Sequence, residues 1–474
     1  MTEVRELLGG WGNCPRLDCR VERPSARPAL LRAVHQVALA DSNCIARGLG
    51  RSYGDSSLNE QGSVLIQTGL NRLLGFDRET GLVTCEAGVS FDELIQIFLP
   101  RGWFLPTTPG TRFVTVGGAI AADVHGKNHH SDGSFGRFVE RIWLLTADGS
   151  IRCCGPAESR DLFCATVGGM GLTGIIVAAS FRLMPVETAW FDVTFRRTES
   201  LEQTLEAFQQ TDGDYRYSVA WIDCLARGRS LGRSVLMLAG DGRVRDLPAS
   251  LQRYPFDVPV KRAKSVPFSF PRGVLNPLSV RAFNECYYRT HRDGRKFVDY
   301  STFFYPLDGV QHWNRIYGRS GFVQYQALFP RATSHEGLVA LLERVSKSRR
   351  ASFLAVLKSS GPQGDGLLSY MSTGHTLALD FPDTGEDLRP FLRELDDILL
   401  RFGGKLYLAK DAMMSADTFR AMYPKLKQFR EVRSTVDPEN RFASTQARRL
   451  GIVDSASRQG ASGRATAVVA GGRG

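Results

Sequence analysis

Helical and strand periodicities alternate along the first part of the chain. Residues 29–41 (ALLRAVHQVALAD) carry apolar side chains at helical spacing, whereas NCIARG, SVLIQT and LVTCEAG are short β-rich runs separated by turn residues. A further helix is expected at 90–99, because Ser90 precedes an apolar run and Glu93 follows three residues later, which is the spacing of a capping box. The chain therefore begins as an α/β unit.

This unit continues to about residue 187. The run VERIWLLTADGSIRCC (139–154) predicts two strands that turn at Asp148-Gly149, a dipeptide that tolerates the positive φ of a tight hairpin. A buried strand is expected at 175–186. Aromatic, β-like runs then follow, interrupted by a Pro-rich, basic stretch at 254–277, and they predict a second, sheet-containing domain.

The composition of the chain excludes several classes of protein. The chain has 474 residues, of which 43% are hydrophobic, which suffices for two domains with large cores. Its nine cysteines are scattered without a Cys-x-x-Cys pair, which favours a reducing compartment over a disulfide scaffold. The pattern shows neither a signal peptide nor an apolar stretch of membrane-spanning length. We therefore expect a cytoplasmic protein.

The net charge of +11 admits several partners. It would attract nucleic acid, an anionic membrane surface or a phosphorylated substrate, but the basic residues are spread along the chain rather than gathered in one tract. No recognised nucleic-acid-binding module accompanies them, so we expect no nucleic acid partner. A basic surface without a specific partner is an equal alternative.

Two glycine-rich segments are places where the backbone can approach a ligand. In ARGLGRSYGDS (46–56), glycines let the chain come close to a diphosphate, although the spacing differs from the G-x-G-x-x-G fingerprint. In the segment 109–134, Gly117-Gly118 opens a helix of small residues that we expect to end at His125. The N-terminus of such a helix can hold a phosphate.

A cluster of basic side chains follows this helix. Four such side chains stand within six residues: His125, Lys127, His129 and His130. No carboxylate or cysteine accompanies them at the spacing of metal ligands, so we expect no metal. For His129 and His130 the simpler interpretation is a bond to backbone carbonyls. For His125 and Lys127, at the end of the glycine helix, a role in the site is favoured.

Three groups of motifs together are characteristic of a family. The motifs are RGLGRSYGD, the series PGT, TVGGAIA and HGKNHH, and ATVGGMGLTGI. They resemble those of the vanillyl-alcohol-oxidase (PCMH-type) FAD-binding oxidoreductases. The resemblance covers nearly the whole chain, to about residue 450. It implies an α+β fold with a FAD-binding domain formed by 1–187 and 404–453. A substrate (cap) domain would span 188–403, and a disordered tail 454–474.

The resemblance also implies FAD as the cofactor. The expected FAD contacts are Ala46, Arg47, Gly48, Leu49, Gly50, Arg51, Ser52, Tyr53, Gly54, Asp55, Ser56, Gly110, Thr115, Val116, Gly117, Gly118, Ala122, His125, Ile176 and Tyr407. Many relatives hold the flavin covalently through a histidine at the position of Arg51. Arginine cannot form that bond, so we expect noncovalent FAD, while a cysteinyl link elsewhere stays open.

Oxidation of an alcohol needs a group that accepts the hydroxyl proton while a hydride moves to the flavin. By resemblance, Lys410 in LYLAKD is the first candidate, and Tyr53 and His125 are alternatives. A lysine acts as a base only if its pKa is lowered; otherwise it orients the substrate and stabilises an alkoxide.

Substrate contacts are expected from five further residues. Lys127 and Lys358 suit the phosphate or the sugar hydroxyls of a substrate, and Gln324 and Gln326 lie two residues apart on one face of a strand. Trp221 is equally a wall for the sugar or a residue of the core.

Within the family, the motifs are similar to those of members that oxidise a polyprenyl-phosphoryl ribose. The implied reaction converts the ribose C2′ hydroxyl of polyprenyl(decaprenyl)-phosphoryl-β-D-ribofuranose to the 2′-keto sugar. An NAD(P)H-dependent short-chain reductase partner would then complete epimerisation to the arabinose donor of cell-wall or surface glycans. The lipid phosphate implies peripheral contact with the inner membrane face. The alternative substrate is a soluble sugar or aldonolactone.

Overall fold

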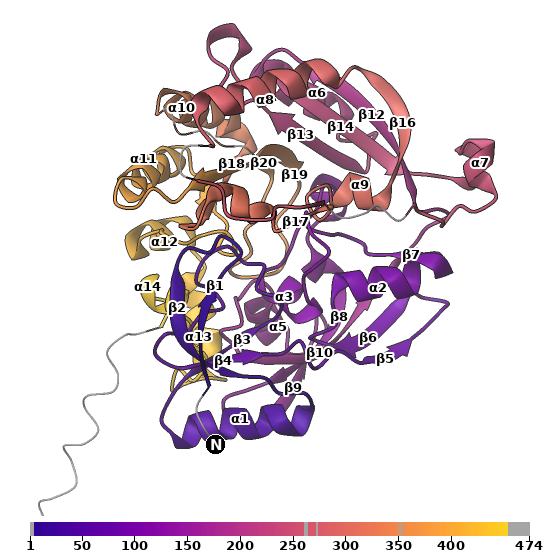
Figure 1. The fold of residues 1–474 in the computed structure, drawn as a ribbon. Coiled ribbons are helices and arrows are strands. Elements are labelled where there is room, and N and C mark those ends of the chain that lie inside the picture. The colour runs from indigo at the N-terminus through magenta and orange to yellow at the C-terminus, as the bar shows by residue number, and fades with distance from the viewer. Residues whose placement is uncertain are drawn as a thin grey trace, which may run out of the picture.

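The computed structural model describes residues 4–259, 264–271, 274–348, 350, 352 and 354–453. The tail expected at 454–474 lies outside the described residues. Three sheets organise the chain: two smaller ones form the lower half of the molecule in Figure 1 and one large sheet forms the upper half.

The first sheet has the strand order β1-β2-β4-β3. Its strands are β1 (Arg5–Gly9), β2 (Arg16–Glu22), β3 (Cys44–Arg47) and β4 (Ser63–Ile66). β4 runs parallel to both β2 and β3, and α1 (Arg27–Leu39) makes the crossover from β2 to β3. Helix α1 buries Leu30, Val34 and Val37 in a cluster with Leu65 and Phe442. The helix and strands expected in this region are confirmed.

The second sheet is antiparallel, with the order β5-β6-β10-β8-β9. Its strands are β5 (Leu73–Phe76), β6 (Leu82–Glu86), β8 (Val139–Leu145), β9 (Ile151–Cys154) and β10 (Ile175–Arg182). The expected hairpin is present as β8 and β9, and Gly149 adopts a φ of 80° in its turn.

The helices of this half are shorter. α2 (Phe91–Phe98) has the expected capping box: Ser90 Oγ accepts from the Glu93 backbone N–H at 3.1 Å, and the Glu93 carboxylate accepts from the Ser90 N–H at 2.7 Å. α5 (Arg160–Thr166) precedes β10. The small-residue helix, α3, spans only Val116–Ala121, so the expectation that it reaches His125 was wrong. The chain leaves the helix because Asp123 takes a φ of 42°, where its carboxylate accepts from the Gly136 N–H.

The large sheet has eight strands in the order β16-β12-β14-β13-β19-β20-β18-β21. They are β12 (Trp190–Thr198), β13 (Tyr217–Ile222), β14 (Ser234–Asp241), β16 (Gly294–Asp299), β18 (Phe322–Pro330), β19 (Ala355–Ser360), β20 (Gly374–Pro382) and β21 (Lys405–Leu406). The second, sheet-containing region expected beyond residue 187 is therefore present, and β21 joins its edge from beyond 403.

Helices cover both faces of the large sheet. They are α6 (Leu201–Thr211), α8 (Pro277–Thr290), α9 (Tyr300–Phe304), α10 (Ser334–Lys347) and α11 (Leu388–Arg401). Successive side chains along a strand point to opposite faces of the sheet. In β18, Tyr325 donates a hydrogen bond to Asp396 of α11 at 3.0 Å, whereas Gln324 and Gln326 point to the opposite face, toward the first two sheets.

The last part of the chain returns to the first two sheets (Figure 1). Its helices are α12 (Ala416–Met422), α13 (Leu426–Ser434) and α14 (Thr445–Arg449). The backbone of Cys44 in β3 donates to Arg441 O, and Arg433 Nε donates to Leu172 O at 2.9 Å. The remaining short elements are α4 (His129–Asp132), α7 (Ala249–Gln252), β7 (Trp103–Phe104), β11 (Met184–Pro185), β15 (Lys264–Ser265) and β17 (Val310–Gln311).

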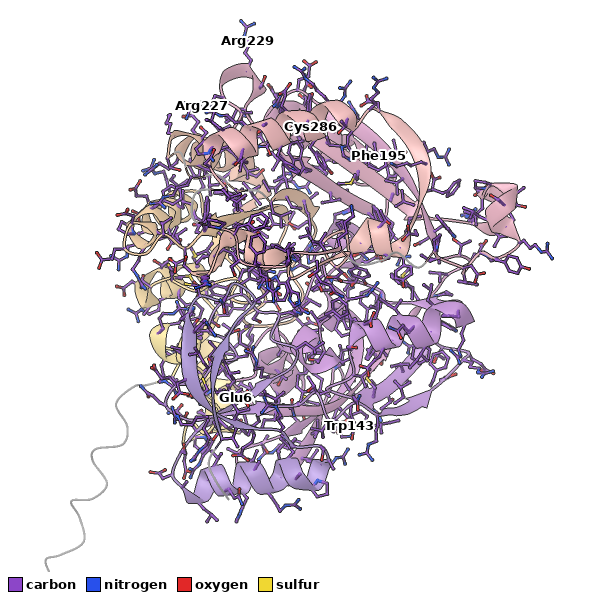
Figure 2. All side chains as sticks on the ribbon, in the orientation of Figure 1. Glu6, Trp143, Phe195, Arg227, Arg229 and Cys286 are labelled. Carbon is purple, nitrogen blue, oxygen red and sulfur yellow. The ribbon has the colours of Figure 1, made fainter. Side chains whose placement is uncertain are left out.

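All nine cysteines are free, and Cys286 is exposed on the outer side of α8 (Figure 2). Within the described ranges, every helix is too short or too polar to cross a membrane.

Candidate active site

A cavity of about 850 Å³ lies between the large sheet and the two smaller sheets. This volume falls in the range of small-molecule and cofactor sites, roughly 300–1,000 Å³. One end is lined by both glycine-rich segments and by the loop around Gly171 and Gly174. The other end is lined by the large sheet, by α8 and by the segment after α9.

The two glycine-rich segments pack tightly on each other. A Cβ on Gly48 would meet Thr115 Oγ1 at 2.2 Å, and that oxygen caps α3 by accepting from the Gly118 N–H at 3.2 Å. On α3, a Cβ at Gly117 would meet Ala87 Cβ at 2.9 Å. Side chains are excluded here by packing, so the backbone itself forms the wall of the cavity.

Most of the residues expected to contact FAD line this cavity. They are Ala46, Gly48, Leu49, Gly50, Arg51, Ser52, Tyr53, Ser56, Gly110, Thr115, Gly117, Gly118, Ala122, His125, Ile176 and Tyr407.

Four of the expected residues do not line it, and each has a structural role instead. Arg47 donates to Gly9 O at 2.7 Å, and Val116 is fully buried in the core. Gly54 lies so close to the Asp411 carbonyl that a Cβ would stand 2.0 Å from it. Asp55 forms an ion pair with Arg449 at 2.7 Å. Within the motif 46–56, some residues therefore line the cavity and others pack behind it.

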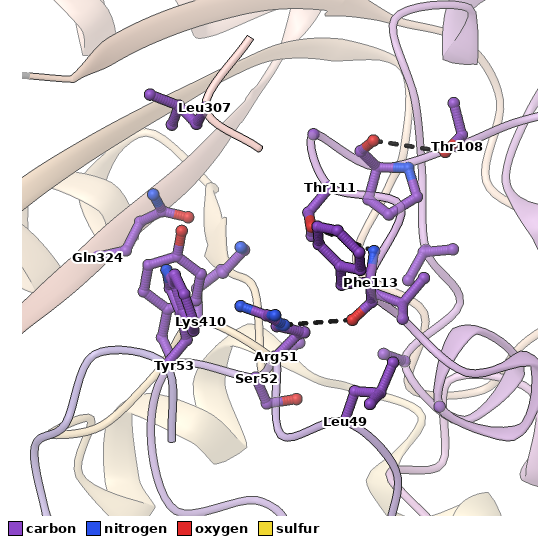
Figure 3. A pocket seen from close by; sticks show the side chains of 18 of the residues that line it. Leu49, Arg51, Ser52, Tyr53, Thr108, Thr111, Phe113, Leu307, Gln324 and Lys410 are labelled. Atoms are coloured by element: carbon purple, nitrogen blue, oxygen red, sulfur yellow. Dashed lines mark hydrogen bonds between the residues drawn. The ribbon is translucent and has the colours of Figure 1, made fainter. Parts of the chain in front are cut away.

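Arg51 holds the two glycine-rich segments together at the cavity wall. Its Nε donates to Phe113 O at 3.2 Å, and its guanidinium lies 4.0 Å from the ring centroid of Trp11 (Figure 3). Burial lowers the pKa of this arginine, and Asp308 acts in the opposite direction. The guanidinium is thus an anchored cation beside the expected cofactor.

His125 lines the cavity and has one buried ring nitrogen without a hydrogen-bond partner. Gln326 Nε2 lies 3.0 Å from His125 Nε2, and because an amide nitrogen only donates, the imidazole Nε2 accepts. The proton is thereby assigned to Nδ1, which is buried and has no partner among the described residues. Burial lowers the pKa of His125 well below its usual value, and Lys358 and other neighbouring cations add to this. The ring is neutral at pH 7.

Lys410 and Tyr53 stand together in the cavity (Figure 3). The Lys410 ammonium lies 3.8 Å from the centroid of the Tyr53 ring. Burial lowers the pKa of Lys410 to about 7, with Asp380 opposing and Lys358 adding to the effect. Burial raises the pKa of Tyr53 well above 10. Lys410 can therefore accept a proton near neutral pH, whereas Tyr53 remains a hydrogen-bond donor.

Two further, partly buried lysines line this cavity. Lys127 donates to Phe303 O and lies 4.1 Å from the Phe303 ring centroid. Burial lowers the pKa of Lys127 to about 7, with a contribution from Lys358, and burial lowers the pKa of Lys358 to about 8. An anion bound here would restore the charge of both amines, because it offsets their burial.

The remaining expected substrate residues also line the cavity. Gln324 and Gln326 are 5% and 6% exposed on the same face of β18. Trp221 of β13 lies 4.5 Å, centroid to centroid, from Tyr287 of α8 and lines the cavity as well, so it forms part of both the wall and the core.

Sequence reasoning missed part of the wall. The cavity is also lined from three distant segments by Trp11, by Phe113, and by Phe283 and Tyr287 of α8. A signal existed for Trp11, which sits between two glycines. The pattern of α8 gives no such signal, because an apolar face of a helix predicts burial without saying against what.

The histidines after α3 have local roles. His130 Nε2 lies 2.9 Å from Tyr215 O, and His129 Nδ1 accepts from the Gly361 N–H at 3.2 Å. In the part of the chain that the structure describes, no three His, Cys, Asp or Glu side chains gather in a way that would hold a metal ion.

The expected FAD fits the cavity on three observations. Glycine backbone without side chains, at Gly48, Gly117 and Gly118, forms the wall at one end, so a diphosphate can approach the chain closely there. His125 Nδ1 is an unpartnered donor in the interior. Apolar side chains such as Ile176 complete a dry wall suited to a flat ring.

Comparisons with known proteins agree with this assignment. Residues 20–155 match the FAD binding domain family, and residues 379–450 match the family of D-arabinono-1,4-lactone oxidase. The decaprenylphosphoryl-β-D-ribose oxidase of Mycolicibacterium smegmatis is 41% identical over 459 residues, which are 95% of this chain and 98% of that protein.

More distant relatives share the same domains. The L-gulono-1,4-lactone dehydrogenase of Mycobacterium tuberculosis is 24% identical over 93% of this chain and 98% of its own length. The Δ(24)-sterol reductase of Homo sapiens matches only 30% of the chain and 28% of its own length, at 30% identity. With 41% identity over almost its full length, the chain belongs to the decaprenylphosphoryl-β-D-ribose oxidase family of vanillyl-alcohol-oxidase-type, FAD-dependent oxidoreductases.

Proposed function

We propose that this enzyme oxidises the C2′ hydroxyl of the ribose in a polyprenyl-phosphoryl-β-D-ribofuranose to the 2′-keto sugar. The observation that carries the proposal is that one cavity combines three partly buried lysines with an apolar arm. A sugar phosphate requires cations and hydrogen-bond donors, whereas an isoprenoid chain requires apolar walls. The name of the 41% identical relative supports the same substrate class.

The apolar arm lies between the large sheet and α8. Its walls are Trp221, Met237, Phe283, Tyr287, Leu354 and Val356. At the N-terminal end of α8, Val274 and Leu278 are 41% and 77% exposed. The arm therefore extends from the lysines along α8, and a sugar head with a long lipid tail needs such an apolar extension.

The residues of the cavity divide the chemistry among them. When bound, FAD supplies the acceptor for the hydride. Lys410 Nζ accepts the hydroxyl proton, because its pKa of about 7 leaves part of it neutral near pH 7. Tyr53 donates a hydrogen bond to the sugar or the cofactor, and His125 lines the same cavity. Lys127 and Lys358 bind the phosphate. The cap formed by the large sheet excludes water from the reacting atoms.

A soluble sugar or aldonolactone is the alternative substrate. The match of residues 379–450 to D-arabinono-1,4-lactone oxidase and the L-gulono-1,4-lactone dehydrogenase relative favour it. Such a substrate is small and carries no lipid, so it would leave the apolar arm without a function.

We expect acid precipitation to leave the yellow flavin in the supernatant, and anaerobic polyprenyl-phosphoryl ribose then to bleach the native enzyme. Among the described residues that line the cavity there is no cysteine, and Arg51 replaces the linking histidine, so FAD has no cysteinyl anchor there. L-Gulono-1,4-lactone, at equal concentration, serves as the comparison. Colour in the pellet contradicts noncovalent FAD, and bleaching by the lactone alone contradicts the lipid substrate.

The keto sugar requires a partner enzyme to become the arabinose epimer. An NAD(P)H-dependent short-chain reductase fits, because the second half-reaction returns a hydride to the same carbon from the opposite face. The oxidase alone is then expected to give a product that lacks two hydrogen atoms, and NAD(P)H is consumed only when the reductase is added. Consumption of NAD(P)H by the oxidase alone would contradict this division.

Peripheral contact with the inner membrane face follows from the lipid substrate. We expect Leu278→Asp to weaken cosedimentation with anionic vesicles several-fold, because it replaces an exposed apolar side chain by a charge that anionic lipids repel. Leu39→Asp is the matched control, since Leu39 is 74% exposed on α1, at the far end of the molecule (Figure 1). Equal loss in both variants, or in neither, counts against a docking surface at α8.

A further inference from the structure

One buried carboxyl group stands next to Lys410 without a role in the chemistry given above. Asp380 of β20 is fully buried and lies directly across from Gln324 of β18. Its Oδ1 accepts from Gln324 Nε2 at 2.6 Å and its Oδ2 accepts from Tyr317 Oη at 3.1 Å. A carboxyl group removed from water keeps its charge only with such donors.

These bonds fix the polar wall of the cavity. Because the amide nitrogen of Gln324 only donates, its bond to Asp380 sets which way the amide points. Gln324 in turn lies beside the Tyr53 hydroxyl and Lys410 (Figure 3). Tyr317 is itself held by stacking on Phe322, with the ring centroids 4.2 Å apart. Asp380 thus ties Gln324, which lines the cavity with Lys410, to Tyr317 behind it.

The charges around Lys410 are unbalanced without Asp380. Lys358 of β19 and His125 face the same space from other elements, and Tyr53 is an un-ionised phenol. Asp380 alone among these groups brings negative charge. Burial raises the pKa of Asp380 to about 7, while Gln324, Lys410 and Tyr317 act to lower it.

We propose that Asp380 is a positioning residue of the oxidation, which orients Gln324 and provides the negative charge that stabilises the Lys410 ammonium. The inference rests on the proposed function in that Lys410 is taken to face the reacting hydroxyl. The hydroxyl proton passes to Lys410 Nζ, and the hydride leaves carbon with its electron pair for FAD. Asp380 offsets the positive charge that this transfer creates on the amine.

The test measures the titration of Lys410 in the holoenzyme. Protein labelled with [13Cε]lysine gives one signal that disappears in Lys410→Met, and its chemical shift is followed against pH. In Asp380→Asn we expect the titration midpoint of Lys410 to fall by about one pH unit or more, because an opposite charge at close range shifts a pKa by about that amount. The pH dependence of flavin bleaching by the substrate should move in the same direction.

Asp396→Asn is the matched control. Asp396 is 4% exposed, accepts from Tyr325 Oη at 3.0 Å, and burial likewise raises its pKa to about 7. It belongs to α11, on the other face of the sheet, so its replacement should leave the titration midpoint of Lys410 unchanged. Equal shifts in both variants would show a general loss of packing and overturn the proposal.

An unchanged Lys410 midpoint in Asp380→Asn overturns the inference, even if ribose substrate still bleaches the flavin and the proposed function stands. A shifted midpoint without bleaching supports the inference and rejects the substrate. If Asp380→Asn does not fold, Tyr317→Phe replaces it. This variant removes one donor to the carboxylate, so the Lys410 midpoint should fall by less but in the same direction, and no fall overturns the proposal.

Discussion

Replacement of Lys410 by methionine is expected to slow anaerobic flavin bleaching by roughly 10²–10⁴-fold, the contribution of a positioned acid or base. Methionine preserves much of the length of the side chain and removes the amine that lies 3.8 Å from the Tyr53 ring centroid. FAD content should stay at the native level, because the glycine-rich segments are untouched. The measurement is stopped-flow absorbance of the flavin with saturating substrate.

The matched control is Lys405→Met. Lys405 is partly buried like Lys410, and burial lowers its pKa to about 8, but it donates to Ser369 O at 3.3 Å instead of lining the cavity. We expect this variant to bleach at close to the native rate. If both lysines matter equally, the effect reports a loss of buried charge in general, and the assignment of Lys410 fails.

The rate of flavin bleaching should also depend on the protonation of Lys410. The amine of Lys410 accepts a proton only when it is neutral, and burial lowers its pKa to about 7. The native bleaching rate should therefore rise as pH increases through about 7, and the residual rate of Lys410→Met should lack this rise. A native rate that falls over the same interval would indicate that the ammonium, as a stabiliser of the alkoxide, is the active form.

Local motifs were the part of the site that the sequence revealed. Gly48 and Gly117 were recognisable because a backbone that approaches a neighbour or ligand tolerates no Cβ, and the structure places Thr115 and Ala87 in that space. The capping box at Ser90 is equally local. The end of α3 was misplaced because its small residues carry no stop signal, and the turn depends on contacts of Asp123 with Gly136 and with Ser369, 246 residues away.

Long-range partners of buried charges could not be predicted in this way. Asp380 and Arg449 had no motif of their own, and the sequence says nothing of which carboxylate meets which cation across hundreds of residues. Asp55 was expected at the cofactor because it sits inside the glycine-rich motif, yet its partner is Arg449, near the end of the described chain. Only the fold decides whether such a motif residue faces the cavity or the core.

That ion pair leads to the second large effect: Arg449→Met should lower the free energy of unfolding by about 3–5 kcal/mol and reduce FAD content. Arg449 donates to Asp55 at 2.7 and 3.1 Å, to Asp411 at 2.9 Å and to Met414 O at 2.7 Å. Both carboxylates have side chains only 3% exposed, so methionine leaves them buried without their cation.

FAD binding should suffer because the two acids belong to the segments that carry Tyr53 and Lys410. The measurements are urea unfolding with excess FAD and flavin content per chain. Arg420→Met is the control, because its partner Asp417 is 89% exposed and such surface pairs contribute at most about 1 kcal/mol. Arg449→Lys should recover only part of the loss, since an ammonium cannot make the paired bonds of a guanidinium.

The pH dependence separates lost charge pairing from lost packing. Burial already raises the pKa of Asp55 in the native enzyme, and Arg449 acts to lower it, so the methionine variant raises the pKa further. A raised carboxyl pKa in the folded state means that folding is favoured at low pH and loses stability as pH rises through the folded value. The stability deficit of Arg449→Met should therefore be largest near pH 7 and narrow as pH falls toward 5. A deficit independent of pH would assign the effect to packing of the arginine stem.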